Sequence, residues 1–327
     1  MEKRTLGSSD IEVSVIGLGC WAIGGWMWGG TDDEKAIAAI QKAIDVGMVF
    51  LDTAAIYGFG HSEQIVGKAI EGRREEIVLA TKCGLVWDHA TDNLSFVDKE
   101  GRAIYRDLTK ENILKEAEES LRRLKTDWVD LYQCHRPDDL TPAEETMEAL
   151  NLLLEQGKIR AIGVSNFPVK MIKDFRQYGT VHSDQPRYSM LDRTIEAEHL
   201  PYYRENNMGI LAYSPLEQGI LTGKVTLDRE FPELDYRRDR PWFQKKNLKR
   251  ALDFLEKLKP MAADHGKTLA QLAANWVICQ DELMVPLVGA RTPEQVIENA
   301  GAADWWLTEE ELKVIDRYVE ELGPPEE

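Results

Sequence analysis

Cysteines and long apolar runs are both scarce in this sequence. Four of its 327 residues are cysteines, and none lies in a CxxC or CxxH spacing. This pattern argues against a disulfide framework and against a zinc site, so we expect no bound metal. No uncharged apolar run approaches the ~20 residues that a membrane span requires, and the polar start MEKRTLGSSD lacks the apolar core of a secretory signal. We therefore expect a cytoplasmic protein with reduced thiols and no membrane partner. The cysteines are Cys20, Cys83, Cys134 and Cys279.

Basic residues are outnumbered by acidic ones. The chain has 40 Lys and Arg residues against 57 Asp and Glu residues, for a formal net charge of -17. A surface of that sign repels a phosphodiester backbone, so we expect no nucleic-acid partner. A local basic pocket for a small phosphorylated ligand stays compatible with this balance. No linker or low-complexity stretch divides the chain, which predicts a single domain over residues 1–327 and leaves the oligomeric state open.

Short apolar runs alternate regularly with longer amphipathic segments. Helix signals mark the amphipathic ones: Asp32 opens an acidic first turn, Thr109 is a predicted N-cap, and Thr141 is an N-cap followed by Pro142, with Gly157 at the far end. Strands separated by a whole helix run parallel through right-handed crossovers. About eight such units predict an α/β fold, the closed (β/α)8 TIM barrel. The predicted strands are VSVIGLG, MVFLDT, IVLATK, WVDLYQCH, IRAIGVSN, VHSDQ, GILAYSP and MVPLVGA.

Four segments fall outside this alternation. The start KRTLGSSDIEVS predicts an N-terminal β-hairpin that covers the bottom of the barrel. The connections 87–107 and 223–244 are longer than ordinary loops, which is typical of functional loops. An extra C-terminal helix is predicted from the N-cap Thr308 to about Leu322.

Polar side chains end three consecutive predicted strands. Asp52 ends the second strand with Tyr57 just beyond it, Lys82 ends the third, and His135 ends the fourth. Barrel chemistry belongs at the carboxyl ends of the strands, so these four side chains are expected on one rim. There a lysine ammonium lowers the pKa of a phenol, an aspartate holds the lysine, and a histidine orients a substrate oxygen, which together make a proton donor for a carbonyl. Taken singly, each has a structural alternative: a turn cap, a packed ring, a solvated lysine and a core histidine.

The remaining strand ends offer groups that suit a nucleotide. Ser165, Asn166 and Gln185 carry side chains that pair with an amide, and Tyr213 offers a flat face for stacking on a ring. The glycine-punctuated segment 214–224 presents backbone N–H groups to phosphates, and Arg291 precedes a helix N-terminus. Ordinary turns, core packing and a surface ion pair are the structural alternatives here.

A Rossmann dinucleotide fold is the competing interpretation. The run GLGCWAIGG contains four glycines, but the G-x-G-x-x-G fingerprint requires glycine where Ala22 stands. The glycines suit a loop close to a cofactor, and the neighbouring Trp21, Trp26 and Trp28 suggest either an aromatic pocket wall or packing of the loop itself.

The motifs LDTAAIYGFGHSE, LATKCG, DLYQCHRPD and IGVSNF, in this order, resemble the aldo-keto reductase superfamily. The likeness runs from Leu6 to the last helix and is greatest to the bacterial, potassium-channel-beta-subunit-like branch. It implies a catalytic tetrad of Asp52, Tyr57, Lys82 and His135, with Tyr57 as general acid and NADP(H) as cofactor. The implied cofactor-binding residues are Trp21, Ser165, Asn166, Gln185, Tyr213, Ser214, Leu216, Gln218, Gly219, Leu221, Gly223, Lys224, Gly289, Arg291, Gln295, Glu298 and Asn299.

One departure from the family pattern bears on the nucleotide. Gln295 stands where many members carry a second basic residue, so recognition of a 2′-phosphate depends chiefly on Arg291. The sequence thus predicts an oxidoreductase that transfers hydride between NADP(H) and a small polar carbonyl substrate. The alternative from another class is a sensor or regulatory subunit that binds the cofactor with little turnover.

Overall fold

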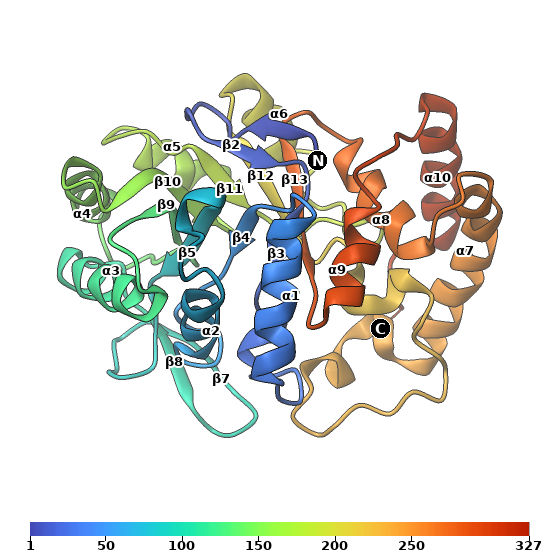
Figure 1. Ribbon diagram of the computed structural model, residues 1–327, viewed down its shortest axis with the longest axis horizontal. Helices are drawn as coiled ribbons and strands as arrows, with labels where there is room; N and C mark the ends of the chain where they lie inside the picture. Colours follow the sequence, from blue (N-terminus) through green and yellow to red (C-terminus); the bar gives the residue numbers. More distant parts are fainter. Residues whose placement is uncertain (327) are drawn as a thin grey trace.

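The computed structural model describes residues 1–326, and at its centre is a closed barrel of eight parallel strands (Figure 1). All eight predicted strands are present in chain order, which confirms the (β/α)8 barrel. The barrel strands are β3 (Gly17–Gly19), β4 (Phe50–Asp52), β5 (Val78–Cys83), β9 (Val129–Cys134), β10 (Ile159–Ser165), β11 (Ser183–Gln185), β12 (Gly209–Tyr213) and β13 (Met284–Gly289).

Helices surround the barrel (Figure 1). The last helix of the ring, α9, packs against the first, α1, so the ring of helices is closed. The helices are α1 (Asp33–Asp45), α2 (His61–Ala69), α3 (Lys110–Leu124), α4 (Ala143–Glu155), α5 (Val169–Phe175), α6 (His199–Glu205), α7 (Lys245–Asp264), α8 (Leu269–Ile278), α9 (Pro293–Ala300) and α10 (Glu309–Leu322). The predicted caps Thr109 and Thr308 each accept a backbone N–H at the start of a helix. Asp32, predicted to open the first helix, is its N-cap and accepts the backbone N–H of Lys35. None of the helices in the described chain is both long and apolar enough to cross a membrane.

The predicted start of α4 is wrong by one residue. Pro142 is the N-cap and the helix begins at Ala143. The hydroxyl of Thr141 donates instead to the Asp138 carboxylate at 2.7 Å, because Asp138 already gathers this loop through the backbone N–H groups of Leu108 and Leu140.

The predicted hairpin consists of β1 (Lys3–Thr5) and β2 (Glu12–Ser14), which pair antiparallel. Its side chains Leu6, Ile11 and Val13 are buried in one cluster with inward-facing residues of the barrel such as Phe50 and Val78. The hairpin therefore fills the amino end of the barrel with apolar side chains, and only the carboxyl end is left for a site.

The two long connections are ordered structures at the other end. Residues 87–107 carry β7 (Leu94–Val97) and β8 (Ala103–Arg106), which form a three-stranded sheet with β6 (Leu85–Val86). Residues 223–244 hold short 3-10 turns at Tyr236–Asp239 and Pro241–Phe243. The predicted C-terminal helix is α10, and it packs on α7, a second helix outside the barrel repeat that the sequence analysis does not predict.

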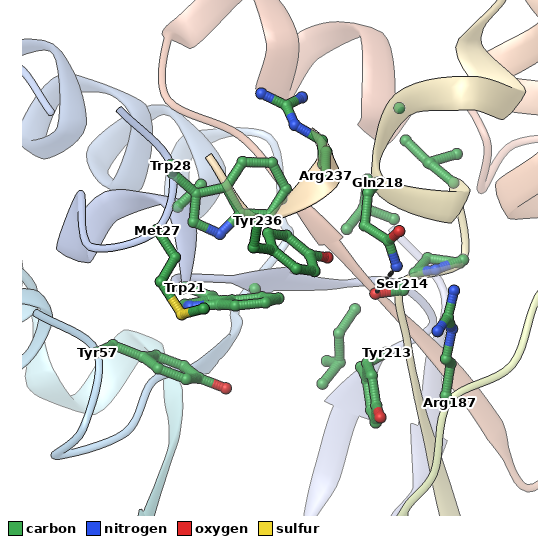
Figure 2. A pocket seen from close by; sticks show the side chains of 18 of the residues that line it. Trp21, Met27, Trp28, Tyr57, Arg187, Tyr213, Ser214, Gln218, Tyr236 and Arg237 are labelled. Atoms are coloured by element: carbon green, nitrogen blue, oxygen red, sulfur yellow. Dashed lines mark hydrogen bonds between the residues drawn. The ribbon is translucent and has the colours of Figure 1, made fainter. Parts of the chain in front are cut away.

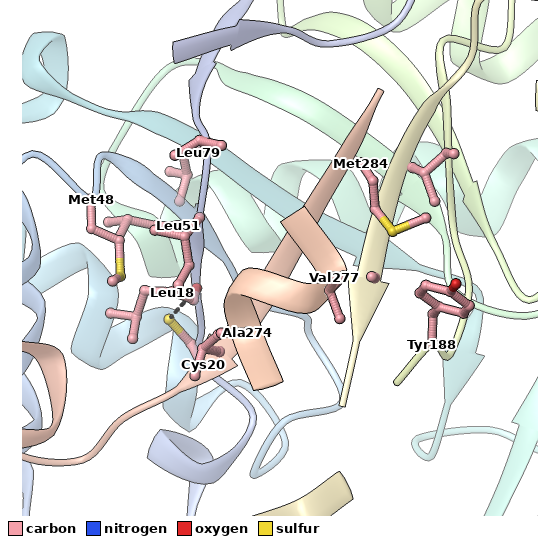
Figure 3. Close-up of a cluster of buried hydrophobic side chains, with 14 of the residues drawn as sticks. Leu18, Cys20, Met48, Leu51, Leu79, Tyr188, Ala274, Val277 and Met284 are labelled. Atoms are coloured by element: carbon pink, nitrogen blue, oxygen red, sulfur yellow. Dashed lines mark hydrogen bonds between the residues drawn. The ribbon is translucent and has the colours of Figure 1, made fainter. Parts of the chain in front are cut away.

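Strand alternation decides which side chains enter the barrel. Leu18, Leu51 and Leu79 point outward into the main core between barrel and helices, where Figure 3 shows them beside Cys20 and Met48. Val78 and Ala80 belong to the cluster inside the barrel. Lys82 has the same parity as these two and therefore points inward.

Candidate active site

Lys82 is the centre of the predicted tetrad. Its ammonium nitrogen Nζ lies 2.6 Å from Asp52 Oδ2, 2.9 Å from the Thr53 carbonyl oxygen and 3.2 Å from the Tyr57 hydroxyl oxygen. The Lys82 side chain is fully buried, and burial alone disfavours an ammonium. Asp52 and then Tyr57 outweigh that effect, so the pKa of Lys82 lies above its ordinary value and the side chain stays charged.

Tyr57 bridges this buried charge to open space. Burial raises the pKa of the Tyr57 phenol, and Lys82 works in the opposite direction without cancelling it. The predicted net lowering of the Tyr57 pKa is therefore wrong in direction, because desolvation of the phenolate exceeds the attraction of the ammonium. Tyr57 therefore keeps its proton at neutral pH.

His135 completes the group from β9. Its ring lies edge-on to the Tyr57 ring, with centroids 5.6 Å apart. Burial, followed by the charges of Lys82 and Arg136, lowers the pKa of His135 well below the usual value. The imidazole is therefore neutral at pH 7, with one N–H to donate and one nitrogen to accept.

Asp52 is held from below by two amides. Gln133 Nε2 donates to Asp52 Oδ1 at 3.1 Å, and Gln185 Nε2 donates to the same oxygen at 2.8 Å. Both carboxylate oxygens thus have partners in a buried site, as a buried charge requires. Sequence reasoning missed Gln133, although its position two residues before His135 on a strand places it on the same inward face.

A cavity of about 630 Å³ opens above the tetrad, with Asp52, Tyr57 and His135 in its wall. Most of the predicted cofactor-binding residues line the same cavity: Trp21, Ser165, Asn166, Gln185, Tyr213, Ser214, Leu216, Gln218, Gly219, Lys224, Gly289, Arg291, Gln295, Glu298 and Asn299. Two predicted residues do not line it. Leu221 is fully buried in the main core, and Gly223 ends the 3-10 helix in a left-handed conformation facing Leu269.

The amide-bearing strand ends form a chain of hydrogen bonds along one wall. Tyr213 donates to Asn166 Oδ1 at 2.8 Å, Asn166 Nδ2 donates to Ser165 Oγ at 2.8 Å, and Ser165 Oγ donates to the Gln185 carbonyl at 2.9 Å. These bonds orient the side chains along the wall and hold the Tyr213 ring through its hydroxyl. The wall suits one face of an aromatic ring that carries an amide.

The segment after β12 has an unusual backbone. Ser214, Glu217 and Gln218 have φ values of 57°, 45° and 51°, and Gly219 has 107°. Non-glycine residues rarely adopt this region, and clusters of such strain mark ligand sites. The Gln218 amide donates to Ser214 Oγ at 3.3 Å while its Oε1 is buried without a partner (Figure 2). The Gln218 Oε1 is an acceptor, which a hydroxyl or amide group of a bound nucleotide could satisfy, and the backbone N–H groups of the strained segment suit its phosphates, so these residues fit the implied cofactor.

Charge in the cavity wall is opposite to that of the whole chain. Two acidic residues, Asp52 and Glu298, line the cavity, and the wall is otherwise rich in cations. Such a local excess attracts an anionic ligand into a molecule of net charge -17. The lining cations are Arg136, Arg187, Lys224, Arg229, Arg237, Arg240 and Arg291.

At the far end of the cavity, side chains of α9 and its N-cap accept the free backbone N–H groups at the start of this helix. Gln295 Oε1 accepts the backbone N–H of Arg291 at 2.8 Å, and Thr292 caps the helix. Lys224 pairs with Glu298 at 2.6 Å, and Asn299 Nδ2 donates to the Gly289 carbonyl at 3.2 Å. The Arg291 guanidinium is exposed, with one long contact of 3.4 Å to the Gly30 carbonyl, so it is available to a ligand.

The connection 223–244 supplies residues that the sequence analysis did not name individually. The Tyr236 ring lies 4.9 Å from the Trp21 ring and 5.6 Å from the Trp28 ring, centroid to centroid (Figure 2). Trp21 in turn stacks 6.2 Å from Tyr57. An aromatic ceiling thus extends over the tetrad. No cluster of three or more His, Cys, Asp or Glu side chains suited to a metal occurs within residues 1–326.

Comparison with known proteins agrees with this geometry. The chain is 40% identical over 329 residues to the "NADH-specific methylglyoxal reductase" of Escherichia coli, covering 98% of this chain and 99% of that protein. The structure of a glycerol dehydrogenase, AKR11B4 from Gluconobacter oxydans, superposes with a TM-score of 0.89 at 39% identity, covering 99% of this chain and 97% of that one.

A Klebsiella pneumoniae aldo/keto reductase solved in complex with NADP and acetate has a TM-score of 0.73 at 28% identity, covering 99% of this chain and 96% of that one. The family model described as "Aldo/keto reductase family" matches residues 15–320. This chain therefore belongs to the aldo/keto reductase family.

Proposed function

We propose that this protein reduces an aldehyde or ketone with NADPH, and that Tyr57 is the general acid. One observation carries the proposal: Lys82 Nζ contacts both the Asp52 carboxylate and the Tyr57 hydroxyl, while Tyr57 and His135 face one cavity. Burying an ion pair costs desolvation free energy that packing alone does not require. An ion pair that contacts a phenol suits proton transfer to a bound oxygen.

Each residue of the tetrad has a separate part in the reaction. Tyr57 keeps its proton until an oxygen within hydrogen-bond reach develops negative charge and accepts it. Lys82 then stabilises the phenolate that remains, and Asp52 keeps Lys82 charged and in place. His135, being neutral, donates its N–H to the same oxygen and orients the carbonyl. In alcohol oxidation the same groups act in reverse.

The nicotinamide nucleotide supplies the hydride when bound. Gln185 and Asn166 would hold the carboxamide beside the Tyr213 ring, and the strained segment from Ser214 to Gly219 would hold the phosphates. We propose NADP(H) because Arg291 lines the cavity with no acidic partner among the described residues. The Klebsiella pneumoniae neighbour was solved with NADP, whereas the Escherichia coli relative is named NADH-specific, so the nucleotide needs a direct test.

Tyr57→Phe tests the role of the acid. This change removes one oxygen, and we expect turnover of short aldehydes to fall by about 10²–10⁴-fold, because the neutral His135 imidazole can hydrogen-bond the substrate oxygen but is a much weaker acid than the phenol. Binding of NADPH and NADH, followed by quenching of protein fluorescence, is expected to stay within about twofold of the parent, with NADPH the tighter ligand. Near-parent turnover in Tyr57→Phe would refute Tyr57 as the general acid. Tighter binding of NADH than of NADPH would refute the proposed NADP(H) preference.

The competing function is a cofactor-binding sensor with little turnover. One experiment on the parent protein distinguishes the sensor from the reductase. The protein is mixed with NADPH and a broad panel of aldehydes, and the absorbance of the reduced nicotinamide is followed. Tight binding without consumption across the whole panel would favour the sensor.

A further inference from the structure

Three loops that are distant in sequence meet over the cavity. They are residues 21–30 after β3, the turn 97–102 between β7 and β8, and residues 223–244 after β12; we refer to them together as the rim ring. In Figure 1 the three lie together at the end of the barrel opposite the N-terminal hairpin. Each bonds to both of the others, which closes the ring.

The first joint links residues 21–30 to the turn 97–102. Trp26 Nε1 donates to Asp98 Oδ2 at 3.1 Å. Asp98 is 7% exposed, and its other oxygen accepts the backbone N–H groups of Glu100 at 2.9 Å and Arg102 at 2.8 Å. The same carboxylate therefore shapes the turn and ties it to the tryptophan loop.

The second joint links the turn 97–102 to residues 223–244 through Lys99. Its Nζ donates to the carbonyl oxygens of Glu233 at 3.1 Å and Asp235 at 3.0 Å and pairs with Asp239 Oδ2 at 2.6 Å. Among residues 1–326, every hydrogen bond or ion pair between these two loops involves Lys99. This joint therefore depends on one side chain.

The third joint links residues 223–244 back to residues 21–30. The backbone N–H of Tyr236 donates to the Met27 carbonyl at 3.3 Å, and the Arg237 guanidinium lies 4.7 Å from the centroid of the Trp28 ring. Figure 2 shows Arg237, Trp28, Tyr236 and Trp21 gathered above Tyr57. Main-chain and aromatic contacts share this joint, so no single side chain holds it.

Two of the three loops line the cavity directly, among them Trp26 and Trp28 from the first and Tyr236 from the third. The turn 97–102 holds these two loops from outside the wall, and Phe96, in the strand that leads into the turn, lines the cavity. We propose that the rim ring sets the upper size of the carbonyl substrate and that Lys99 is its specificity-determining residue. A carbonyl placed at Tyr57 lies under the aromatic ceiling, and the ceiling cannot rise while Lys99 holds the two long loops together. This inference rests on the proposed function and adds a substrate class to it: short aldehydes and ketones rather than bulky ones.

Lys99→Met tests the inference, because the change keeps the length and apolar stem of the side chain and removes its three polar contacts. We expect kcat/KM for a bulky aromatic ketone, relative to that for a short aldehyde, to rise about fivefold, the effect of losing a partly exposed charged joint. Asp239→Asn removes only the ionic contact and is expected to raise the same ratio by about twofold.

Lys115→Met is the matched control. Lys115 pairs with Asp88 at 2.5 Å at the base of the connection 87–107, and it lies outside the rim ring and the cavity. The ratio of kcat/KM values is expected to stay unchanged in this variant. An unchanged ratio in Lys99→Met would overturn the proposal, as would an equal rise in Lys115→Met.

A second readout separates this inference from the proposed function. If the parent protein turns over no carbonyl, the proposed function fails, and the ring is then tested by the release rate of NADPH measured in a displacement experiment. Opening the ring is expected to raise that rate about fivefold in Lys99→Met and to leave it unchanged in Lys115→Met. Equal NADPH release rates in the parent, Lys99→Met and Lys115→Met would overturn the proposal that Lys99 holds the rim ring closed.

Discussion

Lys82 and Asp52 form the most deeply buried ion pair of the site, with the Lys82 side chain inaccessible and that of Asp52 4% exposed. Removing one member leaves the other charged without its main partner. For Lys82→Met we expect a loss of about 3 kcal/mol in the free energy of unfolding, measured by urea denaturation, with Gln133 and Gln185 limiting the loss by their bonds to Asp52.

The double variant Asp52→Asn/Lys82→Met supplies the control for this prediction. It removes both charges, so it is expected to recover at least half of the stability lost in Lys82→Met. A double variant as unstable as the sum of the two single changes would show that the two groups act independently.

Single residues differ in how far the sequence reveals them. Asp52, Lys82 and His135 were predictable because strand parity and strand ends fix where they point. Lys99 and Glu217 were not. Lys99 reaches across to a loop more than 130 residues away, and Glu217 pairs with Arg187 on a backbone whose φ values no propensity indicates. Side chains that bond across loops depend on loop paths, which local sequence does not determine.

At the scale of elements, α3 carries a buried acid that makes its packing pH-sensitive. Glu116 accepts the backbone N–H of Gly84 at 2.7 Å and Asn112 Nδ2 at 2.9 Å, and it is 5% exposed. Burial raises the pKa of Glu116 to about 8, aided by the charge of Glu63 and opposed by these hydrogen bonds and by Arg123. The folded state therefore holds a proton that the unfolded state releases near its ordinary pKa of about 4.3.

A stability prediction follows from the sign of this shift. Between about pH 4.5 and about pH 8 the folded chain binds one more proton at Glu116 than the unfolded chain, so stability falls as pH rises through that window. Glu116→Gln keeps an acceptor oxygen but does not titrate. We expect the urea-unfolding free energy of the variant to decline with pH by about 1 kcal/mol per unit less than that of the parent. Equal slopes would contradict the assignment; Asp184, whose pKa burial raises to about 7, titrates in both proteins.

Elements with strong periodicity and caps were predictable, and exceptions have local causes. The eight strands and the capped helices α1, α3 and α10 match the sequence signals. The start of α4 shifted because Asp138 competes for the Thr141 hydroxyl. α7 follows directly on the connection 223–244 and lies outside the strand–helix alternation on which the prediction is based, and it packs against α10, more than 40 residues further along the chain.

For the whole molecule we propose one cooperative domain over residues 1–327. The barrel is closed by contacts between its first and last units, since α1 packs on α9 and β3 pairs with β13. The nine tryptophans report on tertiary packing, and far-ultraviolet circular dichroism reports on helices. In urea the two signals are expected to change with the same midpoint. Separate midpoints would indicate more than one unfolding unit.

The start of the chain is anchored by residues near its other end. The Arg4 guanidinium donates to the carbonyl oxygens of Ile278 at 3.2 Å, Asp281 at 2.8 Å and Met284 at 2.7 Å. During synthesis on the ribosome Arg4 therefore precedes these carbonyl partners by 274 residues or more, so the hairpin lacks this anchor until they have been made. A nascent chain that ended before this segment would lack both the Arg4 anchor and the Val285 and Leu287 part of the cluster around Leu6, Ile11 and Val13, which would leave these apolar side chains more accessible to chaperones and proteases.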